Sequence, residues 1–356
     1  MKMTRKNFYF LIYILLLPFF IFFVVEFLLN IHFKSMKIPT DNMSKSRYMV
    51  YSEGNLFRKY ENFFKYYPNL NKRYLQIYFH QDKFAKIWDY NFPTNNFGLV
   101  QSNDIYKDKK SILFLGDSFT EGIGAPPWVD KFGKNFLNYQ VINGGIMGTG
   151  FQQFEKIHDH IKENYNVEKV VILYIGGDLR RGIVLLDTTD CLKDNRYCKK
   201  DASFLSIPSN ENEIENFLFE KYKLRQQKKI SLKNNLKYLV RDTYTYNILR
   251  NYINIIRLEN NVSIKKDFQA IENLLKKNEK KIIFINIKTA EEIIKKQESY
   301  EAKLIRKYLA QKKIQNYQCN LNDDINNFHQ IDFHPNKNGY DEIFNCVKKI
   351  LNSNFR

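Results

Sequence analysis

Short apolar runs alternate with amphipathic helical patterns from Lys110 to the end of the chain. The expected strands cover Ser111–Leu115, Tyr139–Ile142, Val170–Ile175 and Lys281–Ile287. The expected helices cover Phe151–Asn164, Phe268–Lys277, Ser299–Lys312 and Tyr340–Leu351. Short strands that are apolar on both faces, alternating with helices, are typical of a parallel sheet covered on both sides. The pattern therefore predicts an α/β fold with its active site at the carboxyl ends of the strands.

A long apolar run near the N-terminus is the second strong pattern. Three basic residues precede Phe8–Val25, which holds eighteen uncharged residues with Pro18 as its only helix breaker. A helix of that length spans about 27 Å, close to the hydrocarbon thickness of a bilayer. The run is longer than the core of a usual signal peptide, and no small-x-small cleavage site follows it before Ser35. We therefore expect residues 1–33 to form an uncleaved, single-pass transmembrane anchor, with the catalytic domain on the periplasmic or extracellular side.

Two segments lack the strand–helix alternation. Residues 34–108 are rich in Tyr, Phe, Asn and Lys, and we expect a lead-in region of short strands and helices that packs on the catalytic domain. Residues 109–356 are expected to form that domain, interrupted at about 192–265 by a helical insertion. Lys-rich helical patterns at Phe217–Lys229 and Tyr238–Ile256 mark the insertion.

Composition indicates a globular protein without a nucleic-acid partner. In 356 residues, 44% hydrophobic and 16% aromatic content is sufficient for a core. The formal net charge is +18, but the lysines are scattered among Asn, Ile, Phe and Tyr along the whole chain. Because no basic cluster interleaved with aromatic residues marks a binding groove, we expect no nucleic-acid surface.

All four cysteines lie after residue 190, at Cys191, Cys198, Cys319 and Cys346. An even number in an exported domain predicts two disulfides. The first two cysteines could close one loop, and the last two would tie the last strand region to the last helix, although the sequence allows three pairings. A zinc site is disfavoured because no C-x2-C spacing occurs. Unpaired buried cysteines are the remaining alternative.

The candidate chemistry lies at two distant points of the chain. Ser118 follows the strand Ser111–Leu115 in the run Gly116-Asp117-Ser118, where a turn delivers its hydroxyl just before a helix. Near the other end, Asp332 stands two residues before His334 in a loop that leads into the final helix. Together they could form a Ser-His-Asp triad. Nothing in the sequence suggests a metal or an organic cofactor.

Four blocks along the chain resemble those of the SGNH (GDSL-type) hydrolase superfamily. They are Gly116-Asp117-Ser118, Asn143-Gly144-Gly145-Ile146-Met147-Gly148, Gly176-Gly177-Asp178 and Asp332-Phe333-His334-Pro335-Asn336. The resemblance covers roughly residues 109–190 and 266–350. Together with the expected N-terminal anchor, it indicates a membrane-anchored bacterial envelope member. The fold expected from it is a three-layer α/β/α sandwich with a parallel, flavodoxin-like sheet.

The resemblance also implies residue roles. Ser118 matches the nucleophile, His334 the general base and Asp332 the carboxylate that orients the histidine, although the family more often spaces the last two by three residues. The backbone N–H groups of Ser118 and Gly148 match donors to the oxyanion.

The third block departs from the family pattern Gly-x-Asn-Asp, whose asparagine donates to the oxyanion. A gapless alignment puts Asp178 at the asparagine position, and a shift by one residue puts Gly177 there. Neither residue offers an amide side chain. Arg180 and Arg181 follow at once and could supply a cation to the oxyanion, to an acidic substrate or to Asp178. Gly148, Gly177, Asp178 and Arg180 are therefore the candidate oxyanion- or substrate-binding residues.

Other polar residues have simpler explanations. His158 and His160 lie two apart on a helical pattern and point to different faces, so we expect surface histidines rather than a metal site. Thr120 and Glu121 are close enough to Ser118 to shape the pocket, but helix capping is the simpler account.

These observations predict a serine-dependent ester hydrolase that acts on acyl esters of a cell-envelope glycan or lipid through an acyl-Ser118 intermediate. An exported polysaccharide O-acetyltransferase with the same triad, working beside a multi-span acyl donor protein, stays open. So does a catalytically degenerate binding module, suggested by the altered third block. The sequence does not determine the substrate, the oligomeric state, or whether the acyl group passes to water or to another hydroxyl.

Overall fold

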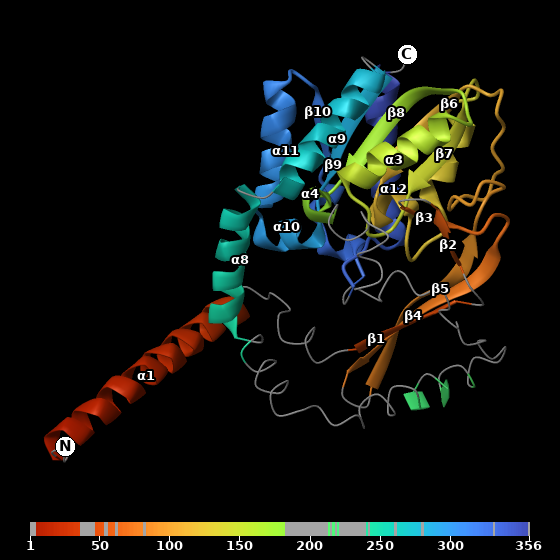
Figure 1. The fold of residues 1–356 in the computed structure, drawn as a ribbon. Helices are drawn as coiled ribbons and strands as arrows, with labels where there is room; N and C mark the ends of the chain where they lie inside the picture. The colour runs from red at the N-terminus through yellow and green to blue at the C-terminus, as the bar shows by residue number, and fades with distance from the viewer. Residues whose placement is uncertain are drawn as a thin grey trace. The chain divides into compact units, whose positions relative to one another are not determined.

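The computed structural model describes residues 5–35, 47–52, 56–60, 63–80, 83–181, 243–259, 262–278, 281–329 and 332–354, with a few isolated positions between 213 and 240. The chain divides into two compact units. One comprises Met1–Arg47 with Phe219–Asn260, and the other comprises Tyr48–Leu218 with Asn261–Arg356. Figure 1 shows the course of the chain. The boundaries expected at residues 33 and 108 stay predictions.

A five-stranded parallel sheet forms the centre of the second unit. Its strands are β6 (Ser111–Gly116), β7 (Gln140–Gly145), β8 (Val167–Tyr174), β9 (Ile282–Ile287) and β10 (Asn316–Cys319), in the spatial order β10-β9-β8-β6-β7. This is the flavodoxin-like order, in which the first strand lies between the second and the third. The carboxyl end of β6 therefore lies at the point where the strand order reverses, which is where such sheets bind their ligands.

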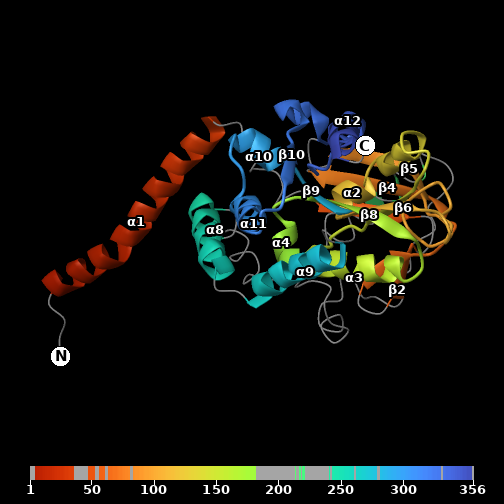
Figure 2. The same cartoon turned by 90° about the horizontal axis from the view of Figure 1, so that it is seen from above.

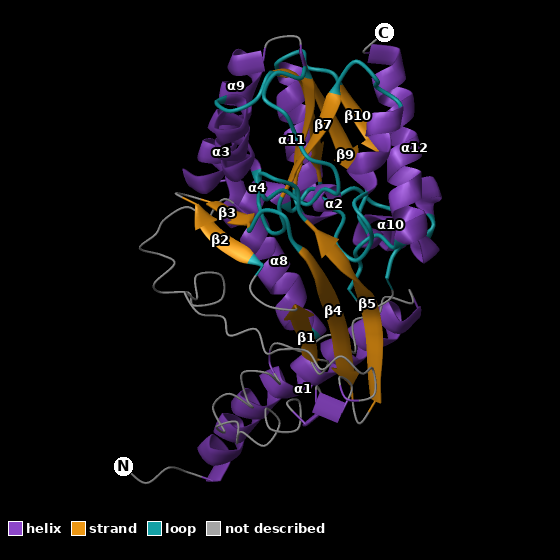
Figure 3. Cartoon of the chain, turned by 90° about the vertical axis from the view of Figure 1, so that its right-hand side faces the viewer, coloured by secondary structure: helices purple, strands orange, loops and turns teal. Residues whose placement is uncertain are grey.

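Helices cover both faces of the sheet, as Figures 2 and 3 show. α3 (Phe151–Lys162) and α9 (Val262–Asn278) lie on one face, and α12 (Lys337–Asn354) and α10 (Ala290–Lys295) lie on the other. α11 (Tyr300–Gln311) packs Tyr308 on Phe268 of α9, with ring centroids 4.3 Å apart. All six residues of β6 are buried, and Phe114 stacks on Phe132 of the 3-10 helix η1 (Trp128–Lys134) at 5.0 Å. The expected α/β sandwich with a parallel sheet is confirmed.

The lead-in region is built from strands. They are β1 (Arg47–Ser52), β2 (Phe57–Tyr60), β3 (Phe63–Tyr66), β4 (Asn71–His80) and β5 (Lys83–Pro93). The expected strands are present, and β4 and β5 are long, with 10 and 11 residues. The expected helices are not found among the described residues from 47 to 108. A register shift between Gln76 and Ile77 interrupts the alternation of β4, so four successive residues, 74–77, are buried. That interruption hid the strand in the sequence.

The first unit contains α1 (Arg5–Ser35) and α8 (Tyr244–Glu259). The Glu26 carboxylate of α1 accepts hydrogen bonds from Tyr244 N at 2.5 Å and from Thr245 N at 3.0 Å, so it caps the N-terminus of α8. No helix in the described part of the chain has the length and apolar character needed to cross a membrane, and the transmembrane anchor expected over residues 1–33 is therefore not found. Most of the expected helix Phe217–Lys229 lies outside the described residues.

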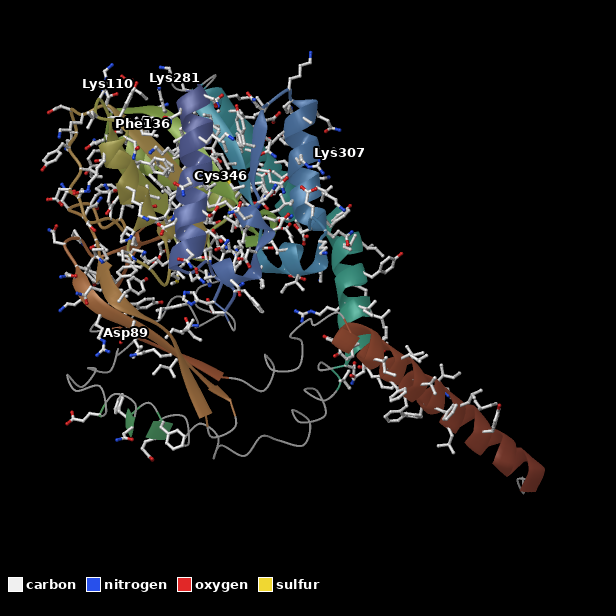
Figure 4. All side chains as sticks on the ribbon, turned by 180° about the vertical axis from the view of Figure 1, so that it is seen from behind. Asp89, Lys110, Phe136, Lys281, Lys307 and Cys346 are labelled. Carbon is white, nitrogen blue, oxygen red and sulfur yellow. A yellow bond between two sulfur atoms is a disulfide. The ribbon has the colours of Figure 1, made fainter. Side chains whose placement is uncertain are left out.

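A disulfide joins Cys319, at the end of β10, to Cys346 on α12, which is labelled in Figure 4. This is one of the two pairs that the sequence favoured. Cys191 and Cys198 lie outside the described residues.

Candidate active site

Ser118 is mounted at the sharp turn where β6 ends. Asp117 caps the short helix α2 (Ser118–Glu121), and its Oδ1 accepts a hydrogen bond from Phe119 N at 2.9 Å. The turn requires glycine at position 116, because a Cβ there would lie 1.9 Å from Thr120 Oγ1 and 2.5 Å from the Leu173 carbonyl oxygen. Ser118 is thus fixed at the carboxyl end of the strand, with 4% of its surface exposed.

His334 and Asp332 meet Ser118 from a tight loop before α12. His334 Nε2 lies 2.9 Å from Ser118 Oγ, and His334 Nδ1 hydrogen-bonds Asp332 Oδ2. Burial opposes ionisation of Asp332, but the hydrogen bond and the charge of His334 outweigh it and lower the pKa of Asp332. An ionised Asp332 accepts the Nδ1 proton and leaves Nε2 to accept the proton of Ser118. The three side chains that the sequence named therefore lie together in hydrogen-bonding order.

The backbone N–H groups of Ser118 and Gly148 are the two oxyanion donors that the sequence named. Among the described residues, neither Ser118 N nor Gly148 N has a hydrogen-bond partner. The loop that carries Gly148 is tied to the end of β6, since Ile146 N donates to the Gly116 carbonyl at 3.1 Å. Gly148 has φ +72°, and no atom lies within 4 Å of where its Cβ would be. This open side leaves room for a substrate beside Gly148.

Glu121 holds the residue before Gly148 in place through a hydrogen bond. It is fully buried; one carboxylate oxygen accepts from Tyr66 Oη at 2.9 Å and the other accepts from Met147 N. Burial raises the pKa of Glu121 to about 8. The sequence suggested helix capping for Glu121, whereas its carboxylate holds the residue next to Gly148.

Asp178 of the third block belongs to an ionic cluster with Arg181 and with Asp117, the residue before Ser118. Asp178 is fully buried, and its carboxylate accepts from Ile175 N at 2.9 Å and from Arg181 Nη1 at 3.2 Å. The same Arg181 nitrogen also hydrogen-bonds Asp117 Oδ2. Burial, followed by the charge of Asp117, raises the pKa of Asp178, with Arg181 acting in the opposite direction. Asp178 is therefore an anchor inside the protein, and the side chain of Arg180 lies outside the described part of the chain.

Two residues of the β4–β5 hairpin reach the triad. Gln76 Nε2 donates to Asp332 Oδ1 at 3.1 Å, across 256 positions of sequence. The ring of Trp88 stands edge-on to that of His334, with centroids 6.0 Å apart. Sequence reasoning missed both, because no motif or spacing connects the lead-in region to the loop of His334.

The two helical histidines differ from each other. The expectation of a surface residue is wrong for His158, which is fully buried and hydrogen-bonds Asp159 at 2.9 Å and Asn278 of α9 at 3.1 Å. It holds α3 against α9. His160 is partly exposed and stacks on Phe97 with centroids 5.1 Å apart.

No protein family and no curated protein matches this sequence. Among solved structures, similar folds include a lipase/acylhydrolase from Enterococcus faecalis, with 11% identity, a TM-score of 0.35, and coverage of 68% of this chain and 96% of that chain. A member of the lipolytic protein G-D-S-L family from Veillonella parvula has 12% identity, a TM-score of 0.32, and coverage of 68% and 98%. A GDSL-like lipase from Bacteroides thetaiotaomicron has 17% identity, a TM-score of 0.33, and coverage of 70% and 91%. At these identities and TM-scores the likeness carries no argument about chemistry, which depends on the geometry of the site.

Proposed function

We propose that this protein is an SGNH-type ester hydrolase that works through an acyl-Ser118 intermediate. The observation that carries the proposal is the continuous hydrogen-bonded series from Ser118 Oγ to His334 Nε2, at 2.9 Å, and from His334 Nδ1 to Asp332. A degenerate binding module has no need of a histidine aligned between a serine hydroxyl and a carboxylate. The geometry therefore favours catalysis over binding alone.

The first half of the reaction forms the acyl-enzyme. His334 Nε2 takes the proton of Ser118 as Oγ attacks the ester carbonyl carbon, and the carbonyl π electrons move to oxygen. The resulting oxyanion accepts hydrogen bonds from the N–H groups of Ser118 and Gly148. Collapse of this intermediate breaks the bond to the alcohol, which leaves with the proton that His334 had taken.

The second half of the reaction hydrolyses the acyl-enzyme and regenerates the Ser118 hydroxyl. His334 Nε2 takes a proton from water as the water oxygen attacks the acyl carbon, and Ser118 Oγ leaves with that proton, which releases a carboxylic acid. A sugar hydroxyl in place of water would make the same enzyme an O-acyltransferase. Because both acceptors use the same residues, only product analysis distinguishes hydrolysis from transfer.

The substrate and location are further parts of the proposal. We propose an acyl ester of a cell-envelope glycan or lipid, handled outside the cytoplasm at a membrane surface. The Cys319–Cys346 disulfide supports an oxidising compartment. The basic residues before the apolar run, and the exposed apolar side chains of α1 such as Phe19, Phe20 and Phe23, support membrane association of the N-terminal segment.

The test uses full-length protein, purified oxidised, with p-nitrophenyl acetate and a fluorophosphonate probe. Ser118→Ala and His334→Ala should each lower turnover by at least about 10³-fold, and Ser118→Ala should abolish labelling. Ser353→Ala, which changes a serine near the end of α12, serves as the matched control and should keep both activities. Oligosaccharide acceptors, followed by mass spectrometry, would then report any acyl transfer.

Well-folded wild-type protein that neither turns over the ester nor takes the label would overturn the proposal. Equal activity in Ser118→Ala would do the same, because it would place the nucleophile elsewhere.

A further inference from the structure

The oxyanion site differs from the family pattern at one position, and an arginine occupies the space beside it. Asp178 has both carboxylate oxygens engaged inside the protein, by Ile175 N and by Arg181. It therefore matches the structural aspartate of the third block, which leaves Gly177 at the position of the missing asparagine. Gly177 is partly exposed and has no side chain to donate.

The guanidinium of Arg181 borders that position. A Cβ at Gly177 would have Arg181 Nη2 at 3.8 Å and Nε at 3.9 Å among its nearest neighbours. An asparagine side chain at 177 would begin at this Cβ. The guanidinium of Arg181, which comes from a different backbone position, therefore reaches the region that the asparagine amide would occupy.

The other edge of the guanidinium is anchored on buried charge. Arg181 Nη1 hydrogen-bonds Asp117 Oδ2, the oxygen that also lies 3.3 Å from Ser118 Oγ. The cation and the nucleophile thus share one carboxylate oxygen. Asp117 and Asp178 have side chains only 1% and 0% exposed, whereas that of Arg181 is 30% exposed. A guanidinium is planar and carries five N–H donors, so its capacity exceeds the hydrogen bonds to these two carboxylates.

We propose that Arg181 is a catalytic residue that donates to the oxyanion in place of the missing asparagine. This inference rests on the proposed function and adds a third donor to Ser118 N–H and Gly148 N–H. As Ser118 Oγ bonds to the carbonyl carbon and its proton passes to His334, the new negative charge on the carbonyl oxygen forms beside a fixed cation. A cation held in place before the reaction requires no reorganisation at that moment, which is why such donors accelerate turnover.

The test compares Arg181→Met with Gly177→Asn/Arg181→Met in the full-length protein. Arg181→Met should lower kcat for p-nitrophenyl acetate by about 10²- to 10³-fold with little change in KM, because the lost contact forms only in the transition state. The added asparagine should recover at least about 10-fold of that loss, since its amide restores a donor at the family position. Arg306→Met removes a guanidinium of α11 that pairs with Glu298, and it should leave kcat unchanged.

The rescue separates an oxyanion donor from a residue that only holds Asp117 and Asp178. A fall in kcat that asparagine at 177 fails to reverse overturns the proposal, and so does a folded Arg181→Met variant with wild-type kcat. If Arg181→Met does not fold, Arg181→Lys keeps a cation near Asp117 without the planar fork. It should lose at least about 10-fold in kcat, and wild-type kcat in that variant overturns the proposal. A wild-type enzyme without turnover or labelling refutes the proposed function and this inference with it.

Discussion

Ser118 Oγ has two acceptors within reach, His334 Nε2 at 2.9 Å and Asp117 Oδ2 at 3.3 Å. The second would hold the hydroxyl proton away from the base if Asp117 carried an uncompensated charge. Arg181 reduces this competition because it binds the same Asp117 oxygen. In the proposed mechanism the arginine therefore helps Ser118 in the resting enzyme as well as in the transition state.

Asp332 also depends on a partner outside the triad motif. One of its oxygens binds His334 and the other accepts from Gln76, whose side chain is buried. Gln76→Ala should lower kcat by about 3- to 10-fold at nearly constant KM, because loss of a net hydrogen bond of about 1 kcal/mol loosens Asp332 and the histidine it orients. Steady-state kinetics on p-nitrophenyl acetate measures the effect.

A second buried glutamine provides the matched control. Gln152 Nε2 donates to Asp267 at 2.7 Å, between α3 and α9 and outside the triad. Gln152→Ala should lower the free energy of unfolding and leave kcat at its wild-type value. Equal kcat for Gln76→Ala and wild type would show that Asp332 holds its position without the hairpin.

Among the elements, the β4–β5 hairpin has a larger role than a lead-in region suggests. It contributes Gln76 and Trp88 to the surroundings of the triad, and β3 contributes Tyr66 to the buried carboxylate of Glu121. These strands lie in the same compact unit as the parallel sheet. The candidate active site is thus built from both parts of that unit.

The disulfide fixes the last helix to the edge strand of the sheet. Cys319 and Cys346 are 27 positions apart, and a crosslink of that size restricts the unfolded chain by about 3 to 4 kcal/mol in the chain-entropy account. Cys319→Ser/Cys346→Ser should lower the free energy of unfolding by an amount of that order, measured by urea denaturation under oxidising conditions.

Under reducing conditions neither the wild type nor the double variant has a crosslink, so their difference in stability there measures the cost of the two substitutions themselves. An oxidised wild type no more stable than the double variant would show that strain or residual unfolded structure cancels the entropic gain.

The sequence predicted the parallel-sheet elements well and part of the residue cluster at the candidate active site, for identifiable reasons. β6, β8 and β9 are buried on both faces, so their apolar runs were visible, and Ser118, Asp332 and His334 stand in local motifs. The partners Gln76 and Trp88 could not be predicted, because contacts between distant segments leave no local pattern. Arg180 and Arg181 looked equivalent in sequence, and only the turn of α4 (Asp178–Arg181) brings Arg181 to Asp117.

At the scale of the whole molecule, several carboxyl groups are buried without a full ionic partner. Burial raises the pKa of Glu121 to about 8, of Asp267 to about 7 and of Asp130 to about 6. Each binds a proton in the folded chain at a pH where the unfolded chain has already lost it. Stability from these groups is therefore greatest below their unfolded pKa values and falls as pH rises through the folded ones.

Glu121→Gln isolates this effect, because glutamine resembles the protonated acid and does not titrate. From pH 5 to pH 8 the variant should gain stability relative to the wild type, by up to about 1.4 kcal/mol per pH unit. Urea unfolding at several pH values, followed by the fluorescence of the buried residues Trp88 and Trp128, measures the difference within the catalytic unit. Glu272→Gln is the control. Lys312 lowers the pKa of Glu272, so Glu272 titrates below pH 5, and the difference in unfolding free energy between Glu272→Gln and the wild type should stay constant from pH 5 to pH 8.

A difference in unfolding free energy between Glu121→Gln and the wild type that is also constant from pH 5 to pH 8 would mean that Glu121 is ionised throughout. In that case Glu121 would hold Met147 as a charged acceptor, and the Gly148 loop would be equally fixed at every pH in that range.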